Sequence, residues 1–569
     1  MQPHRGMTLI DVVVGTALVL IIFLALFGAL RASILLSTLI KNEATANAIA
    51  VNQIEYLRSL PYSSVGTVGG IPAGAIPQNA TTTEDGVNYN VRTFVDYYDD
   101  SADGTGAGDT NGITTDYKRI KVTVSYTIGA KSWQETLVSN YAPPGIETTL
   151  NGGTLQIAVV NAGGSPVAGA SVTITNASTS PTVNLTTFSD VNGFVTLPGA
   201  ATSTQYTVSV TKAGYSTAQT YARAGTNQNP TPGYLTVVKS TTTSATFAID
   251  VLGTLTVDSF SPIATSTFSD SFANASKLAT LTNTAAGGGA LTLSGGAGNY
   301  ALSGTAVSVA TTSPYLVSWG AVNGTRSAPG GTTAIIQVVD GTGTPLPNSV
   351  LPGNSTGFTT FPINLYSVST STYPSLALST AFTTSATSTT PSITNWSLSF
   401  RAGPIPLPNV GFTLTGAKTI GTTGAGAPIY KTSVTANTGS AASNQQTLEW
   451  DSYSLLVPSY DIEDACGVPP YALSPGASII ESLILGPQTS NSALVSVTDS
   501  SGNLVPGTTV TLSRTGYTST VTTSACGTAY FGGVTAGSSY TVSISKTGYT
   551  STNDTGVSIS GETLYAISF

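Results

Sequence analysis

The side chains that most often carry out chemistry in proteins, histidine and cysteine, are scarce in this chain. The only histidine is His4. Without histidine, the body of the protein cannot build a Ser-His-Asp triad, a Cys-His dyad or a histidine-ligated metal site. The two cysteines, Cys466 and Cys526, are too few for a four-thiolate zinc site. We therefore expect no catalytic residues and predict that the protein is not an enzyme.

The two cysteines have two interpretations, a disulfide or a pair of buried free thiols. Cys466 lies near the end of one predicted β domain, and Cys526 lies in the middle of the next. A disulfide would join the two domains, close a loop of about 60 residues and contribute about 4 kcal/mol. We favour the disulfide because exported chains are oxidised.

Carboxylates cluster at one place, the Gly-rich segment DYYDDSADGTGAGDTNGITTDYK between two predicted strands. Clustered oxygen ligands on a flexible backbone suit Ca²⁺, which takes six to eight of them. The spacing is not that of an EF-hand, so a solvated Asp-Gly-rich loop is the alternative, and no cofactor is required elsewhere. The candidate ligands are Asp99, Asp100, Asp103, Asp109, Asn111 and Asp116.

Composition indicates the elements that position these residues. Charged residues make up only 8% of the 569 residues, hydrophobic residues make up 40%, and the net charge is −8. The hydrophobic content is high enough to fill cores, and the negative charge argues against nucleic acid as a partner. Abundant β-branched residues with frequent Gly and Pro predict strands joined by turns. We expect a mainly β, multidomain and extracellular protein.

The N-terminal segment is different, because residues 12–30 form an uncharged apolar run. As a helix, these 19 residues would span about 28 Å, close to the thickness of a bilayer core. His4 and Arg5 precede the run, so we expect a single-pass helix in the inner, cytoplasmic membrane with its N-terminus in the cytoplasm. The body of the chain would then be exported.

Gly6 followed by MTLIDVVVGTALVLIIFLALF resembles the leader of type IV pilins and type II secretion pseudopilins. The resemblance implies that residues 1–6 are a leader, that a prepilin peptidase cuts between Gly6 and Met7, and that the new N-terminus is methylated. Met7 stands where the family usually has Phe, and Asp11 stands where it usually has Glu. In the family, this carboxylate pairs with the N-terminal amine of a neighbouring subunit. The alternative is an ordinary signal anchor with Asp11 at the membrane interface.

The helix is predicted to continue beyond the membrane, because Ala46, Ala50, Ile54 and Leu57 lie on one helical face before Pro61 ends it. Residues 87–97, 117–126 and 131–141 alternate with a period of two, which predicts an antiparallel sheet. A long helix followed by such a sheet resembles the head of a pilin or pseudopilin. We assign residues 7–145 to this domain.

Beyond the linker YAPPGIE, the sequence repeats itself. GSPVAGASVTITN at 164–176 matches GNLVPGTTVTLSR at 502–514, and YTVSVTKAGYST at 206–217 matches YTVSISKTGYTS at 540–551. GPIPLPNVGFTLTG at 403–416 is a more divergent copy. The repeat resembles the carboxypeptidase regulatory-like module, a small prealbumin-like β-sandwich without peptidase chemistry. We assign copies to residues 150–251, 403–487 and 488–569.

Residues 252–402 have a different texture and are similar in outline to concanavalin-like jelly rolls, which often bind sugars. This segment contains only three acids, Asp258, Asp270 and Asp340, and nothing marks them as a catalytic pair. We therefore expect a larger β-sandwich with a binding or spacing role.

Together these observations predict a minor pilin or pseudopilin-like surface protein, with β-sandwich modules for adhesion or spacing. Its expected partners are prepilin peptidase, other pilin subunits through the N-terminal helix, membrane lipid, and a surface glycan or protein ligand. The alternative function is a signal-anchored surface adhesin or carbohydrate-binding protein that does not polymerise.

Overall fold

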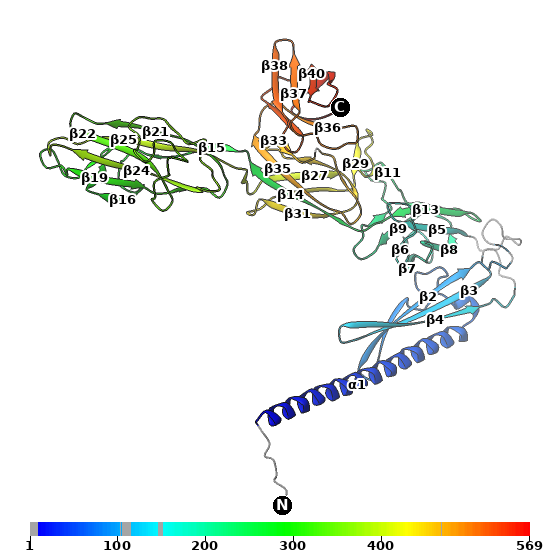
Figure 1. The fold of residues 1–569 in the computed structure, drawn as a ribbon. Helices are drawn as coiled ribbons and strands as arrows, with labels where there is room; N and C mark the ends of the chain where they lie inside the picture. Colours follow the sequence, from blue (N-terminus) through cyan, green and yellow to red (C-terminus); the bar gives the residue numbers. More distant parts are fainter. Residues whose placement is uncertain (1–8, 103, 105–114, 146–151, 468) are drawn as a thin grey trace, which may run out of the picture.

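A computed structural model describes residues 9–102, 104, 115–145, 152–467 and 469–569. The chain is mostly β, with one long helix at its N-terminal end and many sheets that form several β-sandwiches (Figure 1). The predicted fold class is confirmed.

Helix α1 (Leu9–Ser59) has two halves with different surroundings. Its first half is exposed, whereas Ala46, Ala50, Ile54 and Leu57 in its second half are buried against a four-stranded antiparallel sheet, the head sheet. This is the helical face expected from the sequence. The short helix η1 (Tyr62–Ser64) follows, and the head sheet contains β1 (Asn79–Glu84), β2 (Val87–Tyr98), β3 (Tyr117–Ile128) and β4 (Lys131–Tyr141).

The head sheet is followed by module 1, a sandwich of two sheets with strand orders β13-β5-β8 and β10-β9-β6-β7. Alternating residues such as Leu155, Ile157 and Val159 fill the space between the sheets. The strands of module 1 are β5 (Gly152–Val160), β6 (Ser171–Asn176), β7 (Val183–Phe188), β8 (Phe194–Ala201), β9 (Ser203–Thr211), β10 (Ala218–Gln219), β11 (Asn229–Pro230), β12 (Leu235–Val237) and β13 (Thr242–Ala248).

Module 3, at the C-terminal end, repeats the strand pairing of module 1. In both, the first strand pairs in parallel with the last strand and antiparallel with a middle strand: β5 with β13 and β8, and β36 with β42 and β39. The strands of module 3 are β36 (Ser492–Thr498), β37 (Thr509–Arg514), β38 (Tyr517–Thr522), β39 (Thr528–Gly532), β40 (Gly537–Ser545), β41 (Thr552–Ile559) and β42 (Glu562–Ser568).

Module 2 has the same pairing but is assembled from two separate pieces of the chain. Its first strand, β14 (Gly253–Ser261), pairs in parallel with the last strand, β35, and antiparallel with β31. The remaining strands are β26 (Ile405–Pro406), β27 (Gly411–Gly416), β28 (Thr419–Thr422), β29 (Pro428–Tyr430), β30 (Ser433–Asn437), β31 (Ser443–Leu448), β32 (Asp451–Leu456), β33 (Tyr460–Ala465), β34 (Tyr471–Leu473) and β35 (Ser478–Pro487).

Between β14 and β26 lies the inserted sandwich, residues 264–402. Its first and last strands pair with each other from Ala264↔Ala402 to Asp270↔Trp396, so its two ends lie side by side. It extends away from the other units in Figure 1. Its strands are β15 (Ala264–Asp270), β16 (Leu278–Thr282), β17 (Thr284–Gly287), β18 (Ala290–Leu293), β19 (Ser303–Ser308), β20 (Thr311–Thr312), β21 (Leu316–Ser327), β22 (Thr332–Asp340), β23 (Ile363–Asn364), β24 (Ser375–Thr384) and β25 (Ser392–Ala402).

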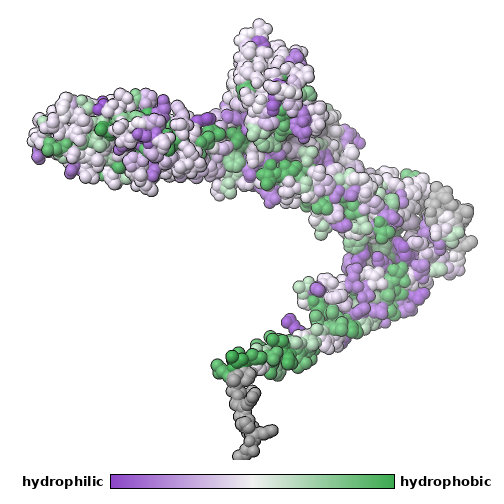
Figure 2. Space-filling model, viewed as in Figure 1, coloured by the Kyte–Doolittle hydropathy of each residue, from purple (hydrophilic) through white to green (hydrophobic). Residues whose placement is uncertain are grey.

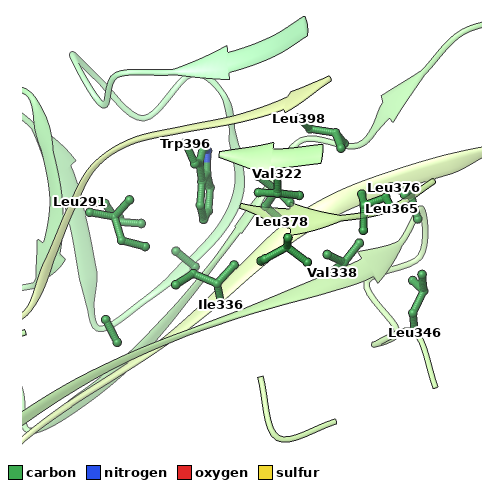
Figure 3. Packing of buried hydrophobic residues seen from close by; sticks show 14 of the residues in the cluster. Leu291, Val322, Ile336, Val338, Leu346, Leu365, Leu376, Leu378, Trp396 and Leu398 are labelled. Atoms are coloured by element: carbon green, nitrogen blue, oxygen red, sulfur yellow. The ribbon is translucent and has the colours of Figure 1, made fainter. Parts of the chain in front are cut away.

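The inserted sandwich has a core of its own. The buried members of this cluster all lie between Phe272 and Leu398, and Figure 3 shows Trp396, Leu378 and Ile336 among them. The sequence predicted that β14 belongs to the same domain as the inserted sandwich, residues 252–402. The structure differs because Leu255 and Val257 of β14 are buried in the core of module 2.

Cross-strand threonine pairs occur in the head sheet and in all three modules. Hydroxyls face each other at 3.0–3.1 Å between Thr123 and Thr136, Thr173 and Thr186, Thr413 and Thr435, and Thr511 and Thr520. Such pairs stabilise neighbouring antiparallel strands without charge, which is consistent with a chain that has few charged residues.

Candidate functional site

The first half of α1 is a candidate membrane and assembly surface. Within the described residues, α1 is the one helix long and apolar enough to cross a membrane, and its first half is coloured as hydrophobic in Figure 2. Asp11 lies in the first turn of α1. Gly6 and Met7, the predicted processing residues, lie outside the described residues.

The predicted calcium loop is described only at its two ends. Asp103, Asp109 and Asn111 lie outside the described residues. At the stem, an Asp116 carboxylate oxygen accepts a hydrogen bond from the Asp100 amide at 2.6 Å, and Asp100 accepts one from the Ala102 amide at 3.1 Å. In the part of the chain that the structure describes, no group of three or more acidic, histidine or cysteine side chains is placed to hold a metal ion. Calcium binding stays a prediction.

Cys466 and Cys526 form a disulfide in the structure, with their Cα atoms 4.5 Å apart. Cys466 follows β33 of module 2, and Cys526 lies in the turn before β39 of module 3. The bridge therefore joins two sandwiches, at positions 60 residues apart in sequence.

Three carboxylates also form hydrogen bonds where modules 2 and 3 meet. Asp461 accepts hydrogen bonds from the Thr489 hydroxyl at 2.6 Å and the Tyr530 hydroxyl at 2.8 Å, and Asp464 accepts one from the Ser524 hydroxyl at 2.7 Å. From module 3, Glu562 accepts one from the Ile462 amide at 2.8 Å. Neutral hydroxyl and amide donors thus satisfy the carboxylates, an arrangement that fits a structural joint.

One acid near this joint lacks such a partner. Glu481 on β35 is only 5% exposed, and its Oε2 atom has no hydrogen-bond partner among the described residues. The buried Tyr471 hydroxyl also has no hydrogen-bond partner among the described residues. Burial raises the pKa of the Glu481 carboxyl to about 7. Ionisation of this buried carboxyl should therefore lower the stability of the fold.

A second charged joint connects modules 1 and 2. Buried Glu449 accepts hydrogen bonds from Lys431 at 2.7 Å, Thr432 at 3.1 Å and Lys418 at 3.3 Å. Lys431 also donates to the Thr217 carbonyl of module 1 at 2.6 Å. Strand β11 of module 1 pairs with β28 of module 2, which extends one small sheet across both modules.

The head sheet and module 1 are joined by polar contacts as well. The Arg92 guanidinium donates to the Thr186 carbonyl at 2.6 Å and lies over the Phe188 ring. Gln78 donates to the Asn184 carbonyl at 2.7 Å. The residues that connect the units are thus spread along the chain, which sequence motifs did not reveal.

Comparison with known proteins supports one of the resemblances. Residues 494–569 match the carboxypeptidase regulatory-like domain family. The predicted module at the C-terminus is thereby confirmed for this part of the chain. No curated protein matches the sequence.

Solved structures with similar elements include the Bacillus anthracis TIE protein, with 12% identity over 79% of this chain and a TM-score of 0.15. The match spans 59% of that protein's length. BcpA, the major pilin subunit of Bacillus cereus, matches at 8% identity over 73% of this chain and 99% of its own, with a TM-score of 0.14. SpaD, a major pilin from Corynebacterium diphtheriae, matches at 11% identity over 73% and 97%, with a TM-score of 0.13. Scores this low carry no argument about function.

Proposed function

We propose that this protein is a minor pilin or pseudopilin-like subunit that displays β-sandwich modules at a cell surface. The observation that carries the proposal is the two-part helix α1, which is exposed and apolar along its first half and packed on a four-stranded antiparallel sheet along its second half. This is the architecture that the leader-like sequence around Gly6 implies. The N-terminus lies in the cytoplasm, the helix crosses the inner membrane, and the body is exported.

In this proposal, prepilin peptidase cuts after Gly6, and Asp11 pairs with the N-terminal amine of a neighbouring subunit. A carboxylate within the bilayer costs at least about 2.5 kcal/mol, and such a pairing would offset that cost. The proposal assigns no enzymatic step to the protein.

Mass spectrometry of the mature N-terminus tests the processing step. We expect the chain to begin at methylated Met7, and a Gly6→Leu variant to keep residues 1–6. A wild-type chain that begins at Met1 would refute cleavage and favour a signal-anchored surface protein.

Filament incorporation is tested separately with two variants at Asp11. Asp11→Ala should be exported and processed but absent from sheared filaments, whereas Asp11→Glu should be incorporated. Equal incorporation of Asp11→Ala would refute the role of this carboxylate.

We further propose that the inserted sandwich is an adhesive unit, and that the three modules are its support. The first and last strands of the inserted sandwich lie side by side, and the sandwich extends away from the other units, which supports this assignment (Figure 1). The test compares glycan-array binding of the full chain with that of a variant that lacks the inserted sandwich. Binding that is lost with this deletion supports adhesion, whereas no binding by either protein would favour a spacer.

A further inference from the structure

The apolar surface of α1 is longer than a bilayer core. Beyond Arg31 the helix continues with Ile34, Leu36 and Ile40, whose exposed fractions are 60%, 58% and 58%. From Leu9 to Ile40 the helix measures about 48 Å, compared with about 30 Å for the hydrocarbon core and 40–45 Å with the headgroups. A tilt of about 25° fits this length between the two outer headgroup surfaces. Arg31 then lies about 12 Å below the outer surface, and its long side chain can extend the guanidinium toward the headgroups. The outer surface of the headgroup layer, called the boundary below, then lies near Ile40.

The head sheet fixes which of its turns faces this boundary. The Tyr89 hydroxyl donates to Asn42 of the helix at 3.1 Å, and the Tyr89 ring lies 5.4 Å from the Tyr126 ring. Tyr126 pairs directly with Trp133 across β3 and β4. At the opposite end of β4, the Tyr141 hydroxyl donates to the Leu60 carbonyl. Trp133 therefore lies at the membrane end of the head.

The β3–β4 turn extends farther still toward the N-terminal half of α1 (Figure 1). Gly129 and Ala130 lie about 10 Å beyond the Tyr126–Trp133 pair, at about 3.3 Å per strand residue. Along a helix this distance corresponds to about seven residues, so the turn reaches the level of Leu35. That level lies inside the boundary set by the apolar surface of the helix.

The turn carries side chains suited to a bilayer interface. Trp133 is 42% exposed, Lys131 is exposed, and Ile128 is half-buried. Tryptophan is enriched at the headgroup level, and lysine can extend its ammonium from there to water. We propose that this turn, residues 128–133, rests in the outer headgroup layer of the bilayer, with Trp133 as its anchor.

Charge is not the source of this contact. Lys41 near the boundary is already paired with Asp85 at 2.9 Å, and Glu84 and Glu43 lie nearby in sequence. We therefore expect the contact in zwitterionic lipid, with no need for anionic headgroups. The inference rests on the membrane-spanning part of the proposed function, and does not depend on cleavage after Gly6 or on filament assembly.

Tryptophan fluorescence in nanodiscs tests the contact with the full chain. The protein is placed at one chain per disc in zwitterionic lipid with brominated acyl chains, which quench nearby tryptophans. Only Trp133, one of four tryptophans, lies in the head; Trp319 and Trp396 are buried in the inserted sandwich, and Trp450 lies in module 2. We expect partial quenching that is absent in Trp133→Phe and retained in the matched control Trp450→Phe.

Each other outcome contradicts the proposal. Equal quenching of the wild type and Trp133→Phe would show that the turn does not reach the lipid. Quenching only with anionic lipid would refute the apolar anchor. A second measurement uses iodide, which quenches tryptophans exposed to water. If Trp133 were protected from iodide only when several chains share a disc, its partner would be another copy of the chain. Failure of the chain to enter discs at all would instead refute the membrane anchor of the proposed function.

Discussion

Replacing Glu481 with glutamine should remove a pH-dependent loss of stability in module 2. The folded-state pKa of this carboxyl is about 7, compared with 4.5 when it is not buried. Below pH 4.5 the group is protonated in both states and has no effect. Between these values the folded state holds a proton that the unfolded state has lost, so stability falls as pH rises. Above pH 7 the loss is complete at about 3 kcal/mol, or 1.36 kcal/mol per pKa unit.

Guanidinium unfolding at pH 5 and pH 8 measures this loss, and the module 2 transition is the one that disappears from the fluorescence trace in a Trp450→Phe background. Burial also raises the pKa of Glu463 and Glu562, so the informative quantity is the difference between wild type and Glu481→Gln. We expect the variant to be about 2–3 kcal/mol less sensitive to this pH change. A control variant, Glu55→Gln, alters an exposed helix carboxylate and should leave the pH dependence unchanged. Equal pH dependence in wild type and Glu481→Gln would refute the assignment.

Three further predictions concern the joints between units. Replacing Cys466 and Cys526 with serine should destabilise the module 2–module 3 pair by about 4 kcal/mol in guanidinium unfolding. Reductant should lower the stability of the wild type to that of the double variant and leave the double variant unchanged. Replacing residues 262–404 with Asn-Gly should leave module 2 folded, because Ser261 and Ile405 are a paired position that a two-residue turn can close. The calorimetric trace of this variant should lack one unfolding transition and keep the others. Glu449→Ala should destabilise module 2 by about 2 kcal/mol, since Lys418 and Lys431 lose a buried acceptor, whereas Glu135→Ala, in the head, should leave that transition unchanged.

Local patterns predicted the elements of this fold well. The helical face at Ala46, Ala50, Ile54 and Leu57 and the alternation in the head strands have periods that dictate which residues are buried. The Gly-Tyr pair shared by the repeats, Gly214-Tyr215 in module 1 and Gly548-Tyr549 in module 3, also has a structural cause. In module 1, Lys212 lies over the ring of Tyr215 and donates to the Ala168 carbonyl in the other repeated motif. Lys546 makes the equivalent contact to Pro506 in module 3.

Long-range placement could not be predicted in the same way. Strand β14 alternates like any strand, and its place in module 2 is shown by its pairings with β31 and β35, which come much later in the chain, and by the core that Leu255 and Val257 join. The importance of Trp133 was equally hidden, because its position relative to α1 depends on the pairing of three strands. Such contacts depend on tertiary structure, which a period of two does not encode.

The course of β14 has a mechanical consequence. This strand follows directly on module 1, which ends at Ala248, and continues into the inserted sandwich at Ala264. Tension between the membrane and a surface held by the inserted sandwich would pass along the covalent backbone of β14, which is already extended. The other strands of module 2, and all of module 3, lie beside this line of tension. They can therefore remain folded, with their surfaces intact, while the tip of the molecule is being pulled.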